Sequence, residues 1–485
     1  MEYLIGVDIG TTQVKGSLLS VSGKLLAMHT VRHQPINLIE GHVEQDAEEY
    51  WWGDFLKVLR SLLAKSEIDR SRIVAIAVSG FYPNLCPTDR WGKPLRRAIL
   101  YSDNRAGNEV KFLNENLGLQ ETTEEIFAKL QWLRRFEPEI FNQTRMLFNP
   151  SNYVLYKLTG IYAIDYLSAY GFGALYNEQK GTWDQEICRT LSLSIELFPT
   201  IFASTVVVGG INSNASQITG LCQGTPVVMG TADSFATMLG ANALEPGDCV
   251  ISYGTSGLCL LLHDQMENLL TKKPSSMQKA MSTLTYLVSL GGSLEWIKDQ
   301  FFNDESKTIA SSKGINRLLD EKIQQIPFGA EGLVMIPYFL GLRLPIWEPE
   351  VRGLIYGLTL KHTKYHLWRA MLESFGYELL SGIEQAVQKG ITIKNFLAAG
   401  GGAGSPIWRQ IVSDIIGQTQ IYTGMDASTA DAFLAGYGIG VFDKMDQIKA
   451  WSTIMDVTEP KHNSQKYKEF YDAYQKVRSM FIEET

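Results

Sequence analysis

Short apolar runs separated by glycine-rich turns open the chain. Residues 3–8, 14–20 and 24–31 each have the length of a strand, and no helical period extends across them. Gly10-Thr11-Thr12 separates the first two runs, and Ser22-Gly23 separates the next two. This pattern predicts three strands joined by tight turns, and therefore an antiparallel sheet.

A helix and a further strand follow these turns. Residues 46–65 carry apolar side chains at helical spacing, and Asp46 is placed to cap the first turn. Residues 73–80 form a continuous apolar run that is typical of a buried strand. A helical crossover between strands indicates an α/β fold.

The same arrangement begins again in the second half. Residues 249–253 and 258–262 are apolar runs on either side of the loop Gly254-Thr255-Ser256-Gly257. A second copy of strand, Gly-Thr loop and strand about 245 residues later predicts two related domains. We place them at residues 1–245 and 246–485.

Composition narrows the class of protein. The 485 residues are 45% hydrophobic and 20% charged, which excludes an intrinsically disordered chain. The net charge of -8 and the absence of a basic stripe argue against a dedicated nucleic-acid binder. No apolar stretch reaches the roughly 18 residues of a membrane span, and the start of the chain lacks the basic region of a secretory signal. Five cysteines without a Cys-x-x-Cys pair indicate reduced thiols, so we expect a cytoplasmic enzyme with neither a nucleic-acid nor a membrane partner.

The two Gly-Thr loops are candidate phosphate sites. Consecutive backbone N–H groups in a glycine turn form a concave site for an anion. Thr11, Thr12, Thr255 and Ser256 add hydroxyl donors, and Lys15 adds a cation. Either loop alone would more often be an ordinary hairpin turn, but the matched pair favours a split phosphate site.

Three acids lie near the ends of predicted strands. Asp8 lies beside the first loop, where Mg2+ would have to separate a carboxylate from phosphate; the alternative is an Asp that caps the loop. Asp233 begins a helix of small residues, where it either caps the helix or acts as general base for a hydroxyl nucleophile. Asp103 has Arg105 close behind it, and a structural ion pair is its default interpretation.

A glycine triplet forms a third candidate. The string GGGAGS at 400–405 follows an apolar run and precedes a predicted helix at 406–417. Glycines there would let a flat ring or a phosphate approach the backbone, and tight packing of strand on helix explains them equally well. The string lacks the third glycine of the dinucleotide fingerprint, and no G-x-x-x-x-G-K-[ST] motif occurs.

Taken in order, several motifs resemble those of the FGGY carbohydrate kinases, most closely the xylulose kinase-like branch. The motifs that carry the resemblance are DIGTTQVKGSLL, AILYSDNRA, NPSNYVLYKLTG, GTADSFATMLGA, ISYGTSG, GGSLEWI, the block from GLVMIPYFLGLRLPIW to RGLIYGLTLKHT, and GGGAGSPIWRQIVSD. The resemblance covers about residues 1–445. It implies two ribonuclease-H-like domains of the actin type, with ATP and Mg2+ in a cleft between them.

The resemblance also assigns roles to residues. Asp233 matches the catalytic base and Asp8 the acid that associates with the metal. The N-terminal domain would hold the sugar and the first phosphate loop, and the C-terminal domain the nucleotide. The positions that match nucleotide-binding residues are Gly10, Thr11, Thr12, Gln13, Lys15, Gly254, Thr255, Gly291, Glu295, Gly401, Gly402 and Ala403.

One segment departs from the family pattern at the expected sugar site. Xylulose kinases usually carry Gln-Met-His-Gly where this chain has Phe81-Tyr82-Pro83-Asn84. A loop directly after a strand can line a cleft, and large rings suit a carbohydrate, although plain packing competes with this interpretation. The residues that we expect at the sugar are Phe81, Tyr82, Asn84, Asp103, Asp233 and Ser234.

The sequence therefore predicts ATP-dependent phosphorylation of a small sugar, a ketopentose such as xylulose. Gluconate, another ketose and a polyol are the alternative acceptors. An actin-like or chaperone-like ATPase and a sugar-binding regulator without catalysis are the alternatives of another class. The small-molecule sugar is the expected partner, and the sequence leaves monomer and homodimer open.

Overall fold

The computed structural model describes residues 1–34, 36–37, 41–274, 276–308, 312–344, 346, 348, 350–461 and 464–483. The chain forms two compact units. The first unit comprises Met1–Leu244, Asp264–Ala280 and Met425–Ser452, and the second comprises Glu245–His263, Met281–Gly424 and Thr453–Thr485.

The division into units differs from the single boundary expected at residue 245. The main boundary does lie at 244/245, but two later segments, 264–280 and 425–452, return to the first unit. The physical reason is helix α17 (Ala427–Gly438), which packs against strands of the first unit's central sheet. The C-terminal half of the chain therefore contributes to both units.

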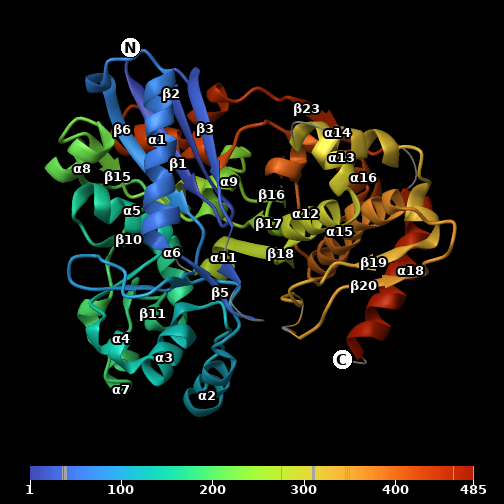
Figure 1. Ribbon diagram of the computed structural model, residues 1–485, viewed down its shortest axis with the longest axis horizontal. Helices are drawn as coiled ribbons and strands as arrows, with labels where there is room; N and C mark the ends of the chain where they lie inside the picture. The colour runs from blue at the N-terminus through green and yellow to red at the C-terminus, as the bar shows by residue number, and fades with distance from the viewer. Residues whose placement is uncertain are drawn as a thin grey trace. The chain divides into compact units, whose positions relative to one another are not determined.

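A six-stranded sheet forms the centre of the first unit (Figure 1), in the order β14-β15-β6-β1-β2-β3. β1, β2 and β3 are antiparallel neighbours, whereas β6 and β15 run parallel to β1. The strand bounds are β1 Tyr3–Ile9, β2 Gln13–Ser20, β3 Leu25–Arg32, β6 Ile73–Gly80, β14 Val207–Gly210 and β15 Pro226–Val228. The hairpin strands and the strand at 73–80 were predicted from the hydrophobic pattern, and these predictions are confirmed.

Two helices cover opposite faces of this sheet. α1 (Asp54–Lys65) packs on the face that carries Val7 and Gly16, where its Val58 and Leu62 lie closest. α17 packs on the other face, which carries Gly6, because alternate residues of a strand point to opposite faces. The predicted helix at 46–65 is present, although its first seven residues, Ala47–Gly53, form a π-helix that Asp46 caps through the backbone N–H of Glu49.

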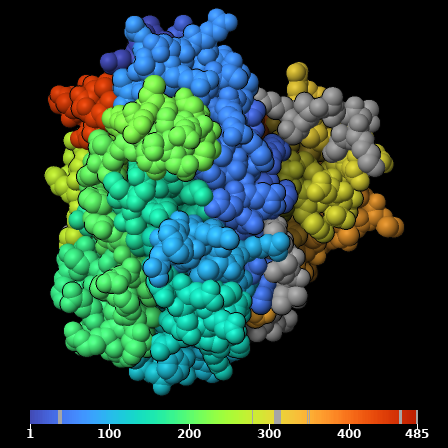
Figure 2. All heavy atoms as spheres, turned by 60° about the vertical axis from the view of Figure 1, so that its left-hand side comes forward, coloured from blue at the N-terminus to red at the C-terminus, as the bar shows by residue number. Residues whose placement is uncertain are grey.

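Short helices and strands inserted between β6 and β15 form a separate region of the first unit. Most of its helices pack around a buried cluster that includes Leu85, Phe127 and Phe172. Figure 2 shows that the cyan to green segments of this region gather into one continuous surface. The helices are α2 Gly107–Leu117, α3 Ile126–Phe136, α4 Pro138–Gln143, α5 Pro150–Thr159, α6 Tyr166–Ala169, α7 Gln185–Thr190 and α8 Ser213–Thr219.

The second unit repeats the sheet of the first. Its order is β18-β17-β16-β21-β22-β23, with an antiparallel meander, then two strands parallel to β16, then an antiparallel edge strand. The bounds are β16 Asp248–Tyr253, β17 Gly257–Leu262, β18 Met281–Leu287, β21 Asn395–Ala399, β22 Gln420–Tyr422 and β23 Asp456–Thr458. The same strand order in both units confirms the internal repeat that the two Gly-Thr loops predicted.

Long helices enclose the core of the second unit. The buried part of this core includes Phe375, Trp408 and Tyr467, one from each of three helices. These helices are α15 Lys364–Gln388, α16 Pro406–Ile416 and α18 Ser464–Glu483, and α12 (Leu290–Phe301) and α14 (Ser312–Ile323) complete the unit. In the part of the chain that the structure describes, no helix is both long and apolar enough to cross a membrane.

Candidate active site

Asp8 lies at the centre of the carboxyl-terminal edge of the first sheet. The strand register places it opposite Lys15 on β2 and opposite Ser79 on β6. The Ser79 hydroxyl lies 3.3 Å from Asp8 Oδ1. The expected phosphate loop follows at once: the backbone N–H of Gly10 donates to the carbonyl of Gln13 at 2.9 Å, which closes the turn. The loop and the acid are therefore held together by the hairpin.

The surroundings of Asp8 disfavour its charged form. Burial, together with the nearby carboxyl of Asp233, raises the pKa of Asp8 to about 7, although Lys15 acts in the opposite direction. Asp426 adds a third negative group close to Asp8. Such a concentration of acids around one lysine favours the binding of a cation.

Asp233 begins α9 (Asp233–Gly240), directly after β15 and the glycine turn. Burial raises the pKa of this carboxyl to about 6, and a hydrogen bond with the backbone of Ser234 lowers it in part. Its side chain is only partly buried. The structure thus brings Asp233 and Asp8, two acids far apart in the sequence, into electrostatic contact within one unit.

A buried carboxyl supports the segment that carries Asp233. Asp165 Oδ2 accepts hydrogen bonds from the Thr231 and Ser204 hydroxyls, each at 3.3 Å. Burial raises the pKa of Asp165 to about 6. Sequence analysis missed this residue, because a helix-capping Asp with two distant hydroxyl partners has no local signature.

Tyr82 is the residue of the Phe81–Asn84 segment that lies next to Asp233. Burial raises the pKa of its phenol, the carboxyl of Asp233 raises it further, and a hydrogen bond with the Ser234 side chain lowers it. Tyr82 is partly exposed. The phenol and the Ser234 hydroxyl are therefore neighbours of the expected base.

The other residues expected at the sugar have internal partners. Phe81 is 2% exposed and lies edge-on to the rings of Trp51 and Tyr101. The Asn84 side chain donates to the carbonyl of Phe81 at 2.8 Å and accepts from the N–H of Tyr101 at 3.0 Å. Phe81 and Asn84 thus hold the loop in shape, and their contact with a sugar stays a prediction.

Asp103 is held in an ion pair. Its carboxylate accepts from Arg105 Nε at 2.9 Å and Nη2 at 2.7 Å, and it also accepts from the backbone N–H of Val43. The side chain is fully buried. The default interpretation of a structural ion pair describes this geometry, and a contact between Asp103 and the sugar stays a prediction.

Asp431 was missed from the sequence. It lies on α17, is fully buried, and accepts a hydrogen bond from the Ser79 hydroxyl at 2.6 Å. Burial raises its pKa well above the usual range, and the carboxyl of Asp8 raises it further. The helix that carries Asp431, α17, packs against the first sheet.

The second unit brings the other nucleotide candidates together around the end of β16. The backbone N–H of Gly291 donates to the carbonyl of Thr255 at 2.9 Å. A Cβ on Gly291 would lie 2.9 Å from the Gly254 carbonyl oxygen, and one on Gly400 would lie 3.0 Å from the Gly254 nitrogen. Only glycine fits these close approaches of three backbone segments. The loop after β16, the start of α12 and the glycine triplet therefore form one backbone cluster.

Four further candidates differ in their exposure. Gly401 has open space where a side chain would lie, as an approaching ligand requires. Gly402 packs against Trp408, and Ala403 is fully buried while its carbonyl accepts from Arg409. Glu295 is exposed and paired with Lys298 on the same helix. Nucleotide contacts of these residues stay predictions.

The residues present fit a magnesium ion of the kind that kinases use. Among the described residues, no group of three or more His, Cys, Asp or Glu side chains is arranged to hold a metal by itself. Mg2+ in phosphoryl-transfer sites is usually bound by one or two carboxylates, water and the substrate phosphates. Asp8 beside the first loop can supply such a carboxylate.

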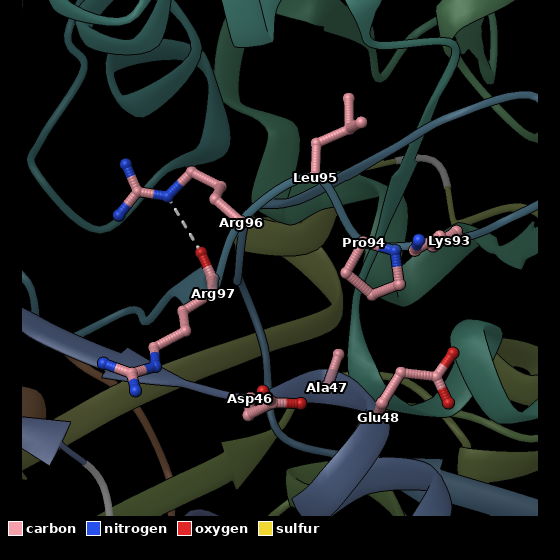
Figure 3. Close-up of a pocket in the computed structure, with 8 residues that line it drawn as sticks. All are labelled: Asp46, Ala47, Glu48, Lys93, Pro94, Leu95, Arg96 and Arg97. Atoms are coloured by element: carbon pink, nitrogen blue, oxygen red, sulfur yellow. Dashed lines mark hydrogen bonds between the residues drawn. The ribbon is translucent and has the colours of Figure 1, made fainter.

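A surface cavity of about 270 Å³ lies elsewhere in the first unit (Figure 3). It is lined by Asp46, Ala47, Glu48, Lys93, Pro94, Leu95, Arg96 and Arg97. Arg96 Nε donates to the carbonyl of Arg97 at 3.0 Å, as the dashed line shows. None of the expected site residues lines this cavity, so it is separate from the candidate active site.

Two units with this sheet order and a Gly-Thr hairpin in each define a protein of the ribonuclease-H-like, actin-type class. The fold matches solved structures from Lactobacillus acidophilus: a ligand-bound xylulose kinase (TM-score 0.82) and a gluconate kinase (TM-score 0.81). Both are 24% identical in sequence, and each match covers 99% of this chain and 98% of that one.

The chain belongs to the FGGY family of carbohydrate kinases. The N-terminal domain of the family matches residues 3–240, and the C-terminal domain matches residues 249–431. A xylulose kinase of Bacillus subtilis is 29% identical, over 98% of this chain and 97% of the relative. A gluconokinase of the same organism is 27% identical, over 92% and 89%. The protein is therefore a carbohydrate kinase, an enzyme that transfers a phosphoryl group from ATP to an alcohol group of a sugar-type substrate.

Proposed function

We propose that this kinase transfers the γ-phosphoryl group of ATP to a hydroxyl of a ketopentose such as xylulose. Asp233 acts as the general base and Asp8 holds Mg2+. The observation that carries the proposal is the partly exposed Asp233 carboxyl, which lies near Tyr82 and Asp8. The pKa of this carboxyl is about 6. The full-length relatives named xylulose kinase support the choice of acceptor.

The reaction proposed for the first unit requires one proton transfer, from the attacking hydroxyl to Asp233. Asp233 is mainly ionised at neutral pH because its pKa of about 6 lies about one unit below pH 7. It accepts the proton of the attacking hydroxyl, while Tyr82 and Ser234 orient that hydroxyl by hydrogen bonding. Backbone N–H groups of the Gly10 loop and the cation of Lys15 face the phosphates. Mg2+, when bound, neutralises charge on the phosphate oxygens.

Gluconate is the second candidate acceptor. A gluconokinase is among the full-length relatives, and the segment Phe81–Asn84 lacks the Met-His pair usual in xylulose kinases. A carboxylate on the acceptor would require a cation near the sugar. Arg105 is already paired with Asp103 and Glu44, at 2.7 and 2.8 Å. These ion pairs favour the neutral ketopentose.

The test is ADP release with Mg2+ and ATP across ketopentoses, other ketoses, gluconate and polyols. We expect a ketopentose to stimulate release, and Asp233→Asn to lower kcat by about 10³ while nucleotide still binds. A retained rate in Asp233→Asn would refute the role of base. Release without sugar that a protein partner stimulates would favour an actin-like ATPase. Sugar binding without transfer to any acceptor would favour a regulator.

A further inference from the structure

Helix α17 approaches the first sheet closely enough to place a second acid beside Asp8. A Cβ on Gly6 of β1 would lie 2.0 Å from the carbonyl oxygen of Ser428 and 2.8 Å from Cβ of Asp431. The Ser17 and Ser428 hydroxyls add a hydrogen bond of 2.7 Å between sheet and helix. The position of Asp431 is therefore fixed by backbone contact on one side of the helix.

The hydroxyl of Ser79 lies between two carboxylates. It is 2.6 Å from Asp431 Oδ2 and 3.3 Å from Asp8 Oδ1. A serine hydroxyl has one hydrogen to donate, and the shorter contact is the stronger hydrogen bond. The hydrogen of Ser79 therefore goes to Asp431, and Asp8 receives only the longer, weaker contact.

Asp431 has a property that a purely structural residue would not need. It is fully buried, yet its second oxygen, Oδ1, has no hydrogen-bond partner among the described residues. A buried carboxylate oxygen without a partner costs stability, and such costs are concentrated at functional sites. An apolar residue on α17 would avoid this cost.

We propose that Asp431 is a positioning residue for phosphoryl transfer, a proposal that rests on the proposed function of Asp8. By accepting the only hydrogen of Ser79, Asp431 leaves the Asp8 carboxylate uncapped and available to the divalent cation. Without Asp431, Ser79 donates to Asp8 instead. The cation then competes with a hydrogen bond for that oxygen, and its affinity falls.

The test is a double-mutant cycle on the full-length protein, with Mn2+ as the probe in place of Mg2+. Free Mn2+ is counted by electron paramagnetic resonance, with and without ADP, for wild type, Asp431→Ala, Ser79→Ala and the double variant. We expect Asp431→Ala to weaken Mn2+ binding about tenfold when Ser79 is present, because alanine offers the Ser79 hydroxyl no acceptor. In the Ser79→Ala background the same substitution should have an effect of less than about twofold.

Thermal unfolding separates positioning from a structural role. Asp431→Ala should unfold within a few degrees of wild type, because losing an unpartnered buried oxygen offsets the small cavity that the substitution leaves. Asp414 is another buried acid, in the second unit, and Asp414→Ala is the control that should leave Mn2+ binding unchanged. Equal effects of Asp431→Ala in both backgrounds, or no Mn2+ binding by wild type, would overturn the proposal. Sugar-dependent ADP release by the same wild-type sample decides the proposed function independently.

Discussion

A carboxyl group that acts as a general base must be ionised at the working pH. Burial raises the pKa of Asp233 from its ordinary 3.8 to about 6, so the group loses its proton only above that value. At Mg2+ concentrations that keep Asp8 ionised in spite of its raised pKa of about 7, we therefore expect kcat/KM to fall about tenfold per pH unit below pH 6 and to be level from 7 to 8. Steady-state rates with a stimulating sugar measure this profile. A rate that stays constant down to pH 5 would contradict the assignment of Asp233.

Glu121 shows the effect of burial on stability. Burial raises the pKa of its carboxyl from 4.5 to about 8, and a hydrogen bond from the Ala174 N–H lowers it in part. Between these two values the folded state binds more protons than the unfolded state, so stability falls as pH rises from 4.5 to 8. Glu121→Gln cannot lose a proton and so avoids this loss of stability. Its melting temperature relative to that of wild type should rise by a few degrees between pH 5 and 8.

The control for Glu121 is an exposed glutamate. Glu115 lies on α2 with its side chain 63% exposed, and Glu115→Gln should keep a constant difference from wild type over the same pH range. Calorimetric scans of both variants at several pH values make the comparison. If the difference in melting temperature between Glu121→Gln and wild type does not grow with pH, the folded protein holds this carboxyl ionised.

At the scale of elements, the contact of α17 with β1 depends on a missing side chain. A Cβ on Gly6 would lie 2.0 Å from the Ser428 carbonyl oxygen and 2.2 Å from the Ala432 nitrogen, and neither backbone atom can rotate away. We expect Gly6→Ala to destabilise the protein by more than about 3 kcal/mol and to lower the yield of folded protein. Gly107→Ala is the matched control, because its Cβ would meet nothing within 4 Å. Thermal unfolding of both variants distinguishes them, and equal melting temperatures would mean that the helix does not approach so closely.

The sequence predicted the elements better than it predicted their neighbours. Strands such as Ile73–Gly80 follow from apolar runs, and the repeat of the Gly-Thr loop anticipated two sheets of the same order. The place of α17 was not predictable in this way. Nearly all of its side chains are buried, so it has no polar face to indicate an orientation, and its partner strand lies at the start of the chain.

The same limit applies to the candidate site. Asp8, Asp233 and the glycine loops could be selected because strand ends and turns mark them locally. Asp431 could not, because its partner Ser79 is 352 residues away in the sequence. The direction of side chains in the segment Phe81–Asn84 was equally hidden, since three of its neighbours, Trp51, Tyr101 and Asn149, come from other parts of the chain.

At the scale of the whole molecule, a late segment of the chain belongs to the first unit, although most of the second unit precedes it in the sequence. Residues 425–452 cover the face of β1 that carries Gly6 and Asp8, so the first unit should not be complete without them. We expect a chain ending at Gly424 to lose amide protection in β1 and β6 and to unfold without a cooperative transition.

A chain ending at Lys461 is the matched control. It lacks α18, which packs in the second unit, but retains α17, and it should keep protection in β1. Hydrogen exchange of residues 3–9 in the two truncated chains decides the matter. Full protection in the chain ending at Gly424 would mean that α17 does not complete the first unit.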